Sequence, residues 1–122
     1  MKPVSILLCL MNFLGCQLAA DFRSVDADRF AQVIKDTTVV RLDVRTASEY
    51  SQGHIPDALL IDVTQADFMQ KAEQLLPKDK TIALYCRSGR RSKTAAQLLA
   101  KQGYQVIELN TGFNSWKGEV ER

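Results

Sequence analysis

The amino-acid sequence predicts an α/β fold with a central parallel β-sheet of about five strands, flanked by helices on both faces. Two features of the 122-residue chain lead to this prediction. Short runs of consecutive apolar residues, typical of strands buried on both faces, alternate with segments whose apolar residues recur every three or four positions. Such alternation builds parallel sheets, because each pair of parallel strands needs a long, usually helical, crossover. The length suits one domain with its own core.

The first half of the domain is predicted to hold two helices and two strands. Residues 27–34 place their apolar side chains on one helical face, and residues 39–44 (VVRLDV) have the composition of a strand. Thr46 and Glu49 have the spacing of a capping box, which predicts a short helix. The apolar run 58–61 (ALLI) is predicted to be a buried strand.

The second half repeats the alternation. A helix is predicted over residues 64–76, where a proline follows, and a strand over residues 82–85 (IALY). Residues 92–102 carry a helical pattern that ends at a glycine. The last strand is predicted at 106–109, followed by a short helical turn within 111–117.

Composition limits the partners of the domain. Apolar residues make up 46% of the chain and charged residues 25%, and the formal net charge is +2. This balance argues against a nucleic acid or a charged membrane surface as the ligand. The basic character is instead local, since Arg87, Arg90, Arg91 and Lys93 fall close together. The cluster predicts a small anionic ligand.

Residues 1–20 have the pattern of a secretory signal peptide rather than of part of the fold. Lys2 gives a positive start, residues 4–14 are mostly apolar, and residues 18–20 (LAA) offer small side chains for cleavage. The apolar stretch is too short to span a bilayer comfortably. Residues 21–122 then form the mature domain.

A second processing route is open at Cys16. The run 13–16 (FLGC) resembles the box of a bacterial lipoprotein, in which Cys16 would become the lipid-anchored first residue. Both routes predict an exported protein, either periplasmic or lipid-anchored at the cell envelope. Because Cys9 also lies in the leader, Cys86 is the one thiol of residues 21–122, which excludes an internal disulfide.

Cys86 directly follows the strand predicted at 82–85 and opens a tight, arginine-rich loop before the next helix. A strand–loop–helix unit of this kind points successive backbone N–H groups and the positive end of the helix dipole toward the start of the loop. A cysteine placed there ionises readily, and the thiolate is its nucleophilic form. The sequence therefore predicts an anion pocket with Cys86 as its nucleophile.

Five motifs, in order, resemble those of a single-domain rhodanese, a thiosulfate sulfurtransferase. They cover nearly all of the domain, and one departure is Asp57, where the family commonly has glycine after the Ile-Pro pair. The motifs are residues 42–45 (LDVR), 49–50 (EY), 53–56 (GHIP), 85–92 (YCRSGRRS) and 112–116 (GFNSW).

The resemblance implies a rhodanese-like fold and a Cys86 that alternates between thiolate and persulfide. Thiosulfate or a related anionic donor would supply the sulfur, and a thiophilic acceptor such as cyanide or a thiol would remove it. No cofactor or metal is implied. Asp43, Arg45 and Glu49 are expected to support the loops structurally, and His54 is expected to close a turn rather than act as a base. The substrate cradle implied for this chain comprises Arg87, Ser88, Gly89, Arg90, Arg91 and Ser92.

Two other functions remain open at this point. The domain could be a persulfide carrier that delivers sulfur from Cys86 to a partner protein, because a fold and a site do not fix the acceptor. It could also be a phosphatase or an arsenate reductase, which use a similar cysteine loop. Those enzymes place five residues between cysteine and arginine, whereas four separate Cys86 from Arg91 here, and the smaller loop favours sulfur over phosphate.

The processing of residues 1–20 can be tested directly. We expect the mature protein to begin either at Asp21 or at a lipid-modified Cys16, because the positive start, apolar middle and small-residue end match an export signal. Cell fractionation followed by N-terminal sequencing and mass determination distinguishes the two routes. A cytoplasmic chain that retains Met1 would contradict both.

Overall fold

The computed structural model describes residues 21–122; the segment 1–20, to which the signal-peptide and Cys16 predictions apply, lies outside the described residues. Within residues 21–122 the chain forms a five-stranded sheet in the order β1-β5-β4-β2-β3, and every pairing is parallel. The strands are β1 (Arg23–Val25), β2 (Val40–Asp43), β3 (Leu59–Leu60), β4 (Thr81–Tyr85) and β5 (Gln105–Leu109).

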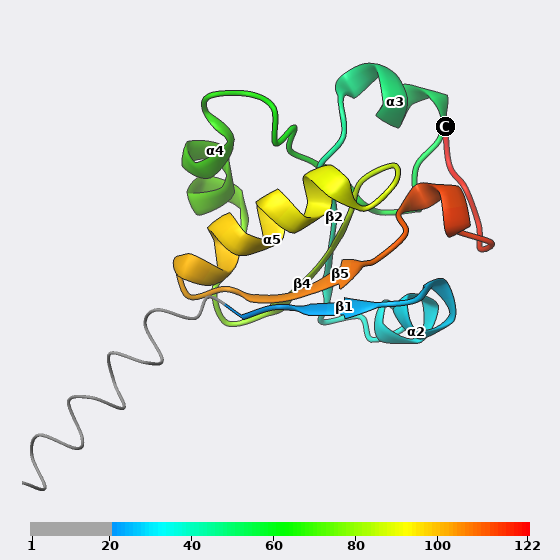
Figure 1. The fold of residues 1–122 in the computed structure, drawn as a ribbon, viewed down its shortest axis with the longest axis horizontal. Helices are drawn as coiled ribbons and strands as arrows, with labels where there is room; N and C mark the ends of the chain where they lie inside the picture. Colours follow the sequence, from blue (N-terminus) through cyan, green and yellow to red (C-terminus); the bar gives the residue numbers. More distant parts are fainter. Residues whose placement is uncertain (1–20) are drawn as a thin grey trace, which may run out of the picture.

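Helices cover both faces of the sheet (Figure 1). Helices α4 and α5 lie on one side and α2 on the other, while α3 and the 3₁₀ turn η1 lie toward the carboxyl ends of the strands. Among the described residues, no helix is both long and apolar enough to cross a membrane. The helical elements are α2 (Ala27–Val33), α3 (Ala47–Gln52), α4 (Phe68–Leu75), α5 (Arg90–Lys101) and η1 (Phe113–Ser115).

The central strand β4 illustrates how the core is filled. Ile82 and Leu84 belong to a buried cluster with side chains of α4 and α5. Ala83 and Tyr85 alternate with them and pack on the other face with side chains of α2. None of the four is exposed to solvent. This two-sided burial explains the continuous apolar run in the sequence and confirms the predicted fold class.

One strand was not predicted from the sequence. Strand β1 is three residues long, and its Arg23 and Ser24 are exposed, so it carries no apolar run. It exists because it pairs with β5, with Ser24 opposite Glu108 in the register.

Two helices begin at other residues than predicted. Helix α4 starts at Phe68 rather than 64, because the Asp62 carboxylate accepts hydrogen bonds from the backbone and hydroxyl of Thr64 and holds that segment in a turn. Helix α5 starts at Arg90 rather than 92, since Gly89, with a φ of 99°, turns the chain into the helix at once. The predicted capping box of α3 is confirmed, with Thr46 and Glu49 bonded reciprocally.

Asp57 occupies a strained position in the turn between α3 and β3. The Ala58 N–H donates to the Ile55 carbonyl at 3.2 Å, which closes a turn with Pro56 and Asp57 at its centre. Asp57 has a φ of 65°, the left-handed value that glycine favours at the third position of a type II turn. The departure from the family's glycine therefore leaves the turn in place but puts a side chain on a backbone that disfavours one.

Replacing Asp57 with glycine is expected to raise the free energy of unfolding by about 0.5–1 kcal/mol. The left-handed conformation costs a residue with a Cβ about 1–2 kcal/mol, and the greater freedom of glycine in the unfolded chain offsets part of that gain. Denaturant unfolding measures the difference. Asp57→Ala is the control, since it keeps the Cβ but loses the polar side chain, and should not stabilise. A loss of stability in Asp57→Gly would contradict the strain.

Candidate active site

Cys86 lies directly after β4, at the carboxyl edge of the sheet, and is fully buried. Ligands of open parallel sheets bind at this edge. Figure 1 shows the loop after β4 meeting the segment after β5 there, with α3 nearby. The sheet therefore places the thiol beneath three converging segments of chain.

Hydrogen-bond donors surround the thiol. The backbone N–H of Gly89 donates to Cys86 Sγ at 3.1 Å. Burial alone would raise the pKa of the thiol, but the donors outweigh it. The side chain and backbone N–H of Ser92, then the N–H groups of Gly89 and Ser88, lower the pKa of the thiol below its ordinary value. The loop thus favours the thiolate, the nucleophilic form.

Two glycines allow the loop after β4 to touch the loop after β5. A Cβ on Gly89 would lie 1.9 Å from the backbone oxygen of Asn110. A Cβ on Gly112, whose φ is 70°, would lie 2.4 Å from the backbone oxygen of Arg87. Each contact involves backbone that cannot move without moving its loop, so glycine is required at both positions.

Hydrogen bonds join the same two loops. The Phe113 N–H donates to the Cys86 carbonyl at 2.8 Å, and the Asn114 N–H donates to the Arg87 carbonyl at 3.0 Å. Lys93 Nζ adds two further bonds, to the carbonyls of Gly89 at 3.0 Å and Asn110 at 3.1 Å. The cradle is therefore a backbone structure closed from both sides.

The arginines of the loop differ in whether a carboxylate already pairs with them. Arg91 forms a bidentate pair with Glu49, with N–O distances of 2.7 and 2.9 Å, which fastens α5 to α3. The hydrogen bond from Arg91 is the main reason that the pKa of Glu49 falls to about 2. Arg87 and Arg90 are exposed. Arg87 is thus the arginine of the loop that stands both exposed and beside a cavity.

Asp43 and Arg45 form a buried ion pair at the end of β2. Arg45 Nε and Nη2 donate to the Asp43 carboxylate at 2.9 and 2.7 Å, and Nη2 also donates to the Gly53 carbonyl at 2.7 Å. The guanidinium lies over the Phe113 ring, 4.5 Å from its centroid. The pair therefore links β2, the end of α3 and η1, and its charges neutralise each other.

A cavity of about 240 Å³ adjoins the cradle. Arg87 gives it a positive charge that has no close carboxylate partner among the ion pairs of the described residues. Its lining consists of Arg45, Glu49, Gln52, Gly53, Arg87, Phe113 and Asn114.

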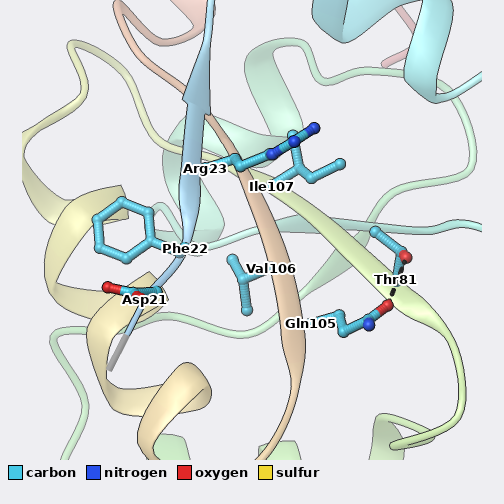
Figure 2. Close-up of a pocket in the computed structure, with 7 residues that line it drawn as sticks. All are labelled: Asp21, Phe22, Arg23, Thr81, Gln105, Val106 and Ile107. Atoms are coloured by element: carbon cyan, nitrogen blue, oxygen red, sulfur yellow. Dashed lines mark hydrogen bonds between the residues drawn. The ribbon is translucent and has the colours of Figure 1, made fainter. Parts of the chain in front are cut away.

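A larger cavity, of about 400 Å³, lies at the opposite edge of the sheet. Figure 2 shows side chains from the amino ends of β1, β4 and β5 around it, with a hydrogen bond of 3.4 Å between Thr81 and Gln105. No residue of the cysteine loop lines it. Chemistry therefore favours the smaller cavity as the ligand site.

His54 is held away from any role as a base. Its ring stacks on Tyr50 with 3.6 Å between centroids, and its Nδ1 lies 2.9 Å from the Tyr50 carbonyl oxygen. Its Nε2 lies 3.4 Å from a carboxylate oxygen of Glu121. Both ring nitrogens thus face structural partners. Among residues 21–122, no group of three His, Cys, Asp or Glu side chains is placed to hold a metal ion.

Of the predicted cradle residues, the structure brings Ser88, Gly89 and Ser92 to the Cys86 thiol, whereas Arg87 and Arg90 are exposed and Arg91 is bonded to Glu49. Asp43 and Arg45 pair with each other, and the structure also adds residues that the sequence analysis did not single out. Asn110 and Asn114 close the cradle, and Gln52 lines the cavity. Glu108 lies buried beneath Ser92. The motif 112–116, which begins with Gly112 after the last predicted strand, was the sequence signal for this second loop.

Comparisons with known proteins agree with this geometry. A family model described as a rhodanese-like domain matches residues 26–119. A sulfurtransferase of Allochromatium vinosum is 37% identical over 94 residues, which are 75% of this chain and 85% of that protein. A thiosulfate sulfurtransferase GlpE of Pseudomonas savastanoi is 32% identical and covers 80% of this chain and 89% of its own. A putative sulfur carrier protein YrkF of Bacillus subtilis is 33% identical over 84% of this chain, which spans 55% of that protein.

Solved structures show the same fold. A rhodanese-related protein of Thermoplasma volcanium superposes with a TM-score of 0.72 at 27% identity, over 82% of this chain and 98% of that one. A rhodanese-like domain protein of Staphylococcus aureus gives a TM-score of 0.71 at 25% identity, over 82% of this chain and 97% of that one.

The contact of Gly89 with Asn110 can be isolated by a matched pair of substitutions. Gly89 and Gly103 have nearly the same φ, 99° and 95°, but a Cβ on Gly103 would meet nothing within 4 Å. Gly103→Ala should cost about 0.5–1 kcal/mol of unfolding free energy, because the lower freedom of alanine in the unfolded chain offsets part of the backbone strain. Gly89→Ala should cost about 1–3 kcal/mol more, because the methyl group collides with backbone.

Denaturant unfolding measures both costs in stability. Titration of the ultraviolet absorbance of the thiolate measures the pH at which Cys86 ionises, which reports on the donors of the cradle. We expect Gly89→Ala, but not Gly103→Ala, to raise the pH at which the thiol ionises, since the colliding methyl group displaces the loop donors. Equal costs and equal midpoints in the two variants would contradict the contact.

Proposed function

The chain belongs to the family of rhodanese-like domains, and on that premise we propose that it is a thiosulfate sulfurtransferase that carries a sulfane sulfur on Cys86. The observation that carries the proposal is the set of donors from Ser88, Gly89 and Ser92 that lowers the pKa of a buried thiol. Relatives that are named sulfurtransferases support sulfur transfer as the general activity. Thiosulfate as the donor rests on the chemistry of the site.

In the first half-reaction the Cys86 thiolate attacks the outer sulfur of thiosulfate. A new bond forms between Sγ and that sulfur, the bond between the two sulfur atoms of thiosulfate breaks, and sulfite leaves with the electron pair. The product on the protein is a persulfide. Its outer sulfur lies where the inward N–H groups of the cradle converge, and those groups stabilise negative charge on it.

In the second half-reaction a thiophilic acceptor, such as cyanide or a thiolate, attacks the outer sulfur. The bond from that sulfur to Sγ breaks, and Cys86 leaves as a thiolate. The same donors that lower the pKa of Cys86 make it a good leaving group, because low-pKa thiols leave faster. One cradle thus serves both halves of the cycle.

Charge repulsion must be offset because a dianionic donor approaches an anionic nucleophile. Backbone N–H dipoles and the start of α5 supply most of the compensation, since Arg91 is engaged by Glu49. Arg87, which is exposed and lines the adjoining cavity, supplies a positive charge for the sulfonate end of the donor.

A second candidate function is that of a persulfide carrier for a partner protein. It is favoured by the relative whose name is putative sulfur carrier protein, although this chain spans 55% of that relative. Both functions use the Cys86 persulfide, so they differ in the acceptor and in the rate of release. We further propose that the domain acts outside the cytoplasm, a location that rests on the sequence of residues 1–20.

The proposal is tested by mass spectrometry of the protein before and after treatment with thiosulfate. We expect a gain of one sulfur atom, its loss on addition of cyanide, and steady turnover when both are present. Cys86→Ser should take up no sulfur and retain less than about 1% of the turnover, because it removes the covalent nucleophile. Its fold should be unchanged, since the hydroxyl nearly matches the thiol in shape.

Cys86→Ser is also the control for sulfur that binds at another cysteine, because the full chain contains Cys9 and Cys16 as well. Any sulfur that this variant takes up is not on residue 86. Sulfur that loads onto Cys86 but passes quickly only to a protein acceptor would favour the carrier. Hydrolysis of an aryl phosphate without persulfide formation would overturn both functions in favour of a phosphatase.

A further inference from the structure

A buried carboxylate lies behind the cradle. Glu108, in β5, is fully buried on the face covered by α5. Its Oε1 accepts a hydrogen bond from the Ser24 hydroxyl at 2.5 Å, and its Oε2 accepts one from the Ser92 hydroxyl at 2.5 Å. Lys93 Nζ lies 3.2 Å from Oε2. No step of the sulfur-transfer cycle described above uses this carboxylate.

Ser92 connects Glu108 to the nucleophile. Its hydroxyl donates to Glu108 Oε2, and hydrogen bonding by the same side chain is one of the causes that lower the pKa of the Cys86 thiol. A serine hydroxyl has one hydrogen to donate, so it can serve only one of these two acceptors at a time. Whichever acceptor carries more negative charge competes better for that hydrogen.

We propose that Glu108 is a positioning residue for sulfur transfer: it competes with Cys86 for the Ser92 hydrogen and thereby limits the charge that the sulfur holds. While the Sγ atom is neutral, as in the persulfide, the Ser92 hydroxyl donates to Glu108. When the acceptor removes the outer sulfur and Sγ becomes a thiolate, the hydroxyl turns to Sγ. Ser24 and Lys93 keep the Glu108 carboxylate bonded in that state.

The charged groups around this network come from few elements. Lys93 of α5 faces Glu108, and Ser24 faces it from β1 as a neutral donor. Arg91, also of α5, is near enough for the Cys86 charge to affect its pKa, but Glu49 of α3 holds its guanidinium. The competition for one hydrogen is therefore set mainly by Glu108 and its two other donors.

The inference rests on the proposed function only in taking Cys86 to react as a thiolate. It is tested by titrating the thiolate absorbance of the isolated protein, with each variant compared against the same variant carrying Cys86→Ser, so that tyrosines and other cysteines cancel. This readout needs neither a sulfur donor nor reagent access to a buried thiol. Sulfur loading is measured separately, so the network and the proposed function can fail independently.

Four proteins give a double-mutant cycle with Glu108→Gln and Ser92→Ala. Glu108→Gln preserves shape but weakens the competing acceptor, so the midpoint of Cys86 ionisation should fall by about 0.5–1 pH unit. Ser92→Ala removes the hydroxyl and should raise the midpoint by about one unit. The double variant should match Ser92→Ala within about 0.2 unit, because Glu108 acts through that hydroxyl.

A third variant shifts the midpoint in the direction opposite to Glu108→Gln. Ser24→Ala removes one donor from Glu108, which then holds the Ser92 hydrogen more firmly, so the midpoint should rise by a few tenths of a unit and should not move in the Ser92→Ala background. An unchanged or raised midpoint in Glu108→Gln would overturn the inference. A fall of equal size in the Ser92→Ala background would also overturn it, since Glu108 would then act through space. If Glu108→Gln fails to fold, the Ser24→Ala pair decides.

Discussion

The site depends on a contact between two backbones. The parallel pairing of β4 with β5 brings their carboxyl ends side by side, so the loops that follow them must pass each other at close range. Gly89 and Gly112 are the points where they touch, and neither could carry a Cβ without displacing the other loop. That contact holds the segment whose Ser88, Gly89 and Ser92 N–H groups lower the pKa of the thiol. The acidity of the thiol thus depends on loop packing together with the Ser92 side chain.

Sequence patterns reveal what is local in this molecule. The strand–cysteine–loop–helix unit, the capping box at Thr46 and the two-sided burial of β4 each depend on neighbouring residues, and each could be predicted. What could not be predicted depends on distant partners. Strand β1 has no apolar run and forms only by pairing with β5. The sequence places Arg91 in the loop pattern and Glu49 in a predicted helix, 42 residues apart, and gives no sign that the fold pairs them.

Glu108 is the clearest case of information that the sequence conceals. A glutamate between Ile107 and Leu109 is expected at a solvated position of a strand, since glutamate is seldom fully buried unless paired. Its burial here is tolerated because two hydroxyls and one ammonium group converge on it from β1 and α5. The number of arginines also overstates the positive charge that the site offers to a ligand, because the charge of Arg91 is largely offset by Glu49 and that of Arg45 by Asp43.

The complete burial of Cys86 has a consequence for recognition. An empty sulfur at that depth offers nothing for another macromolecule to touch. Under the proposed function, a transferred sulfur extends that side chain by one bond of about 2 Å. A donor or an acceptor must then reach a sulfur that lies below the surface, so a slender reactive group can approach it where a broad, folded surface cannot.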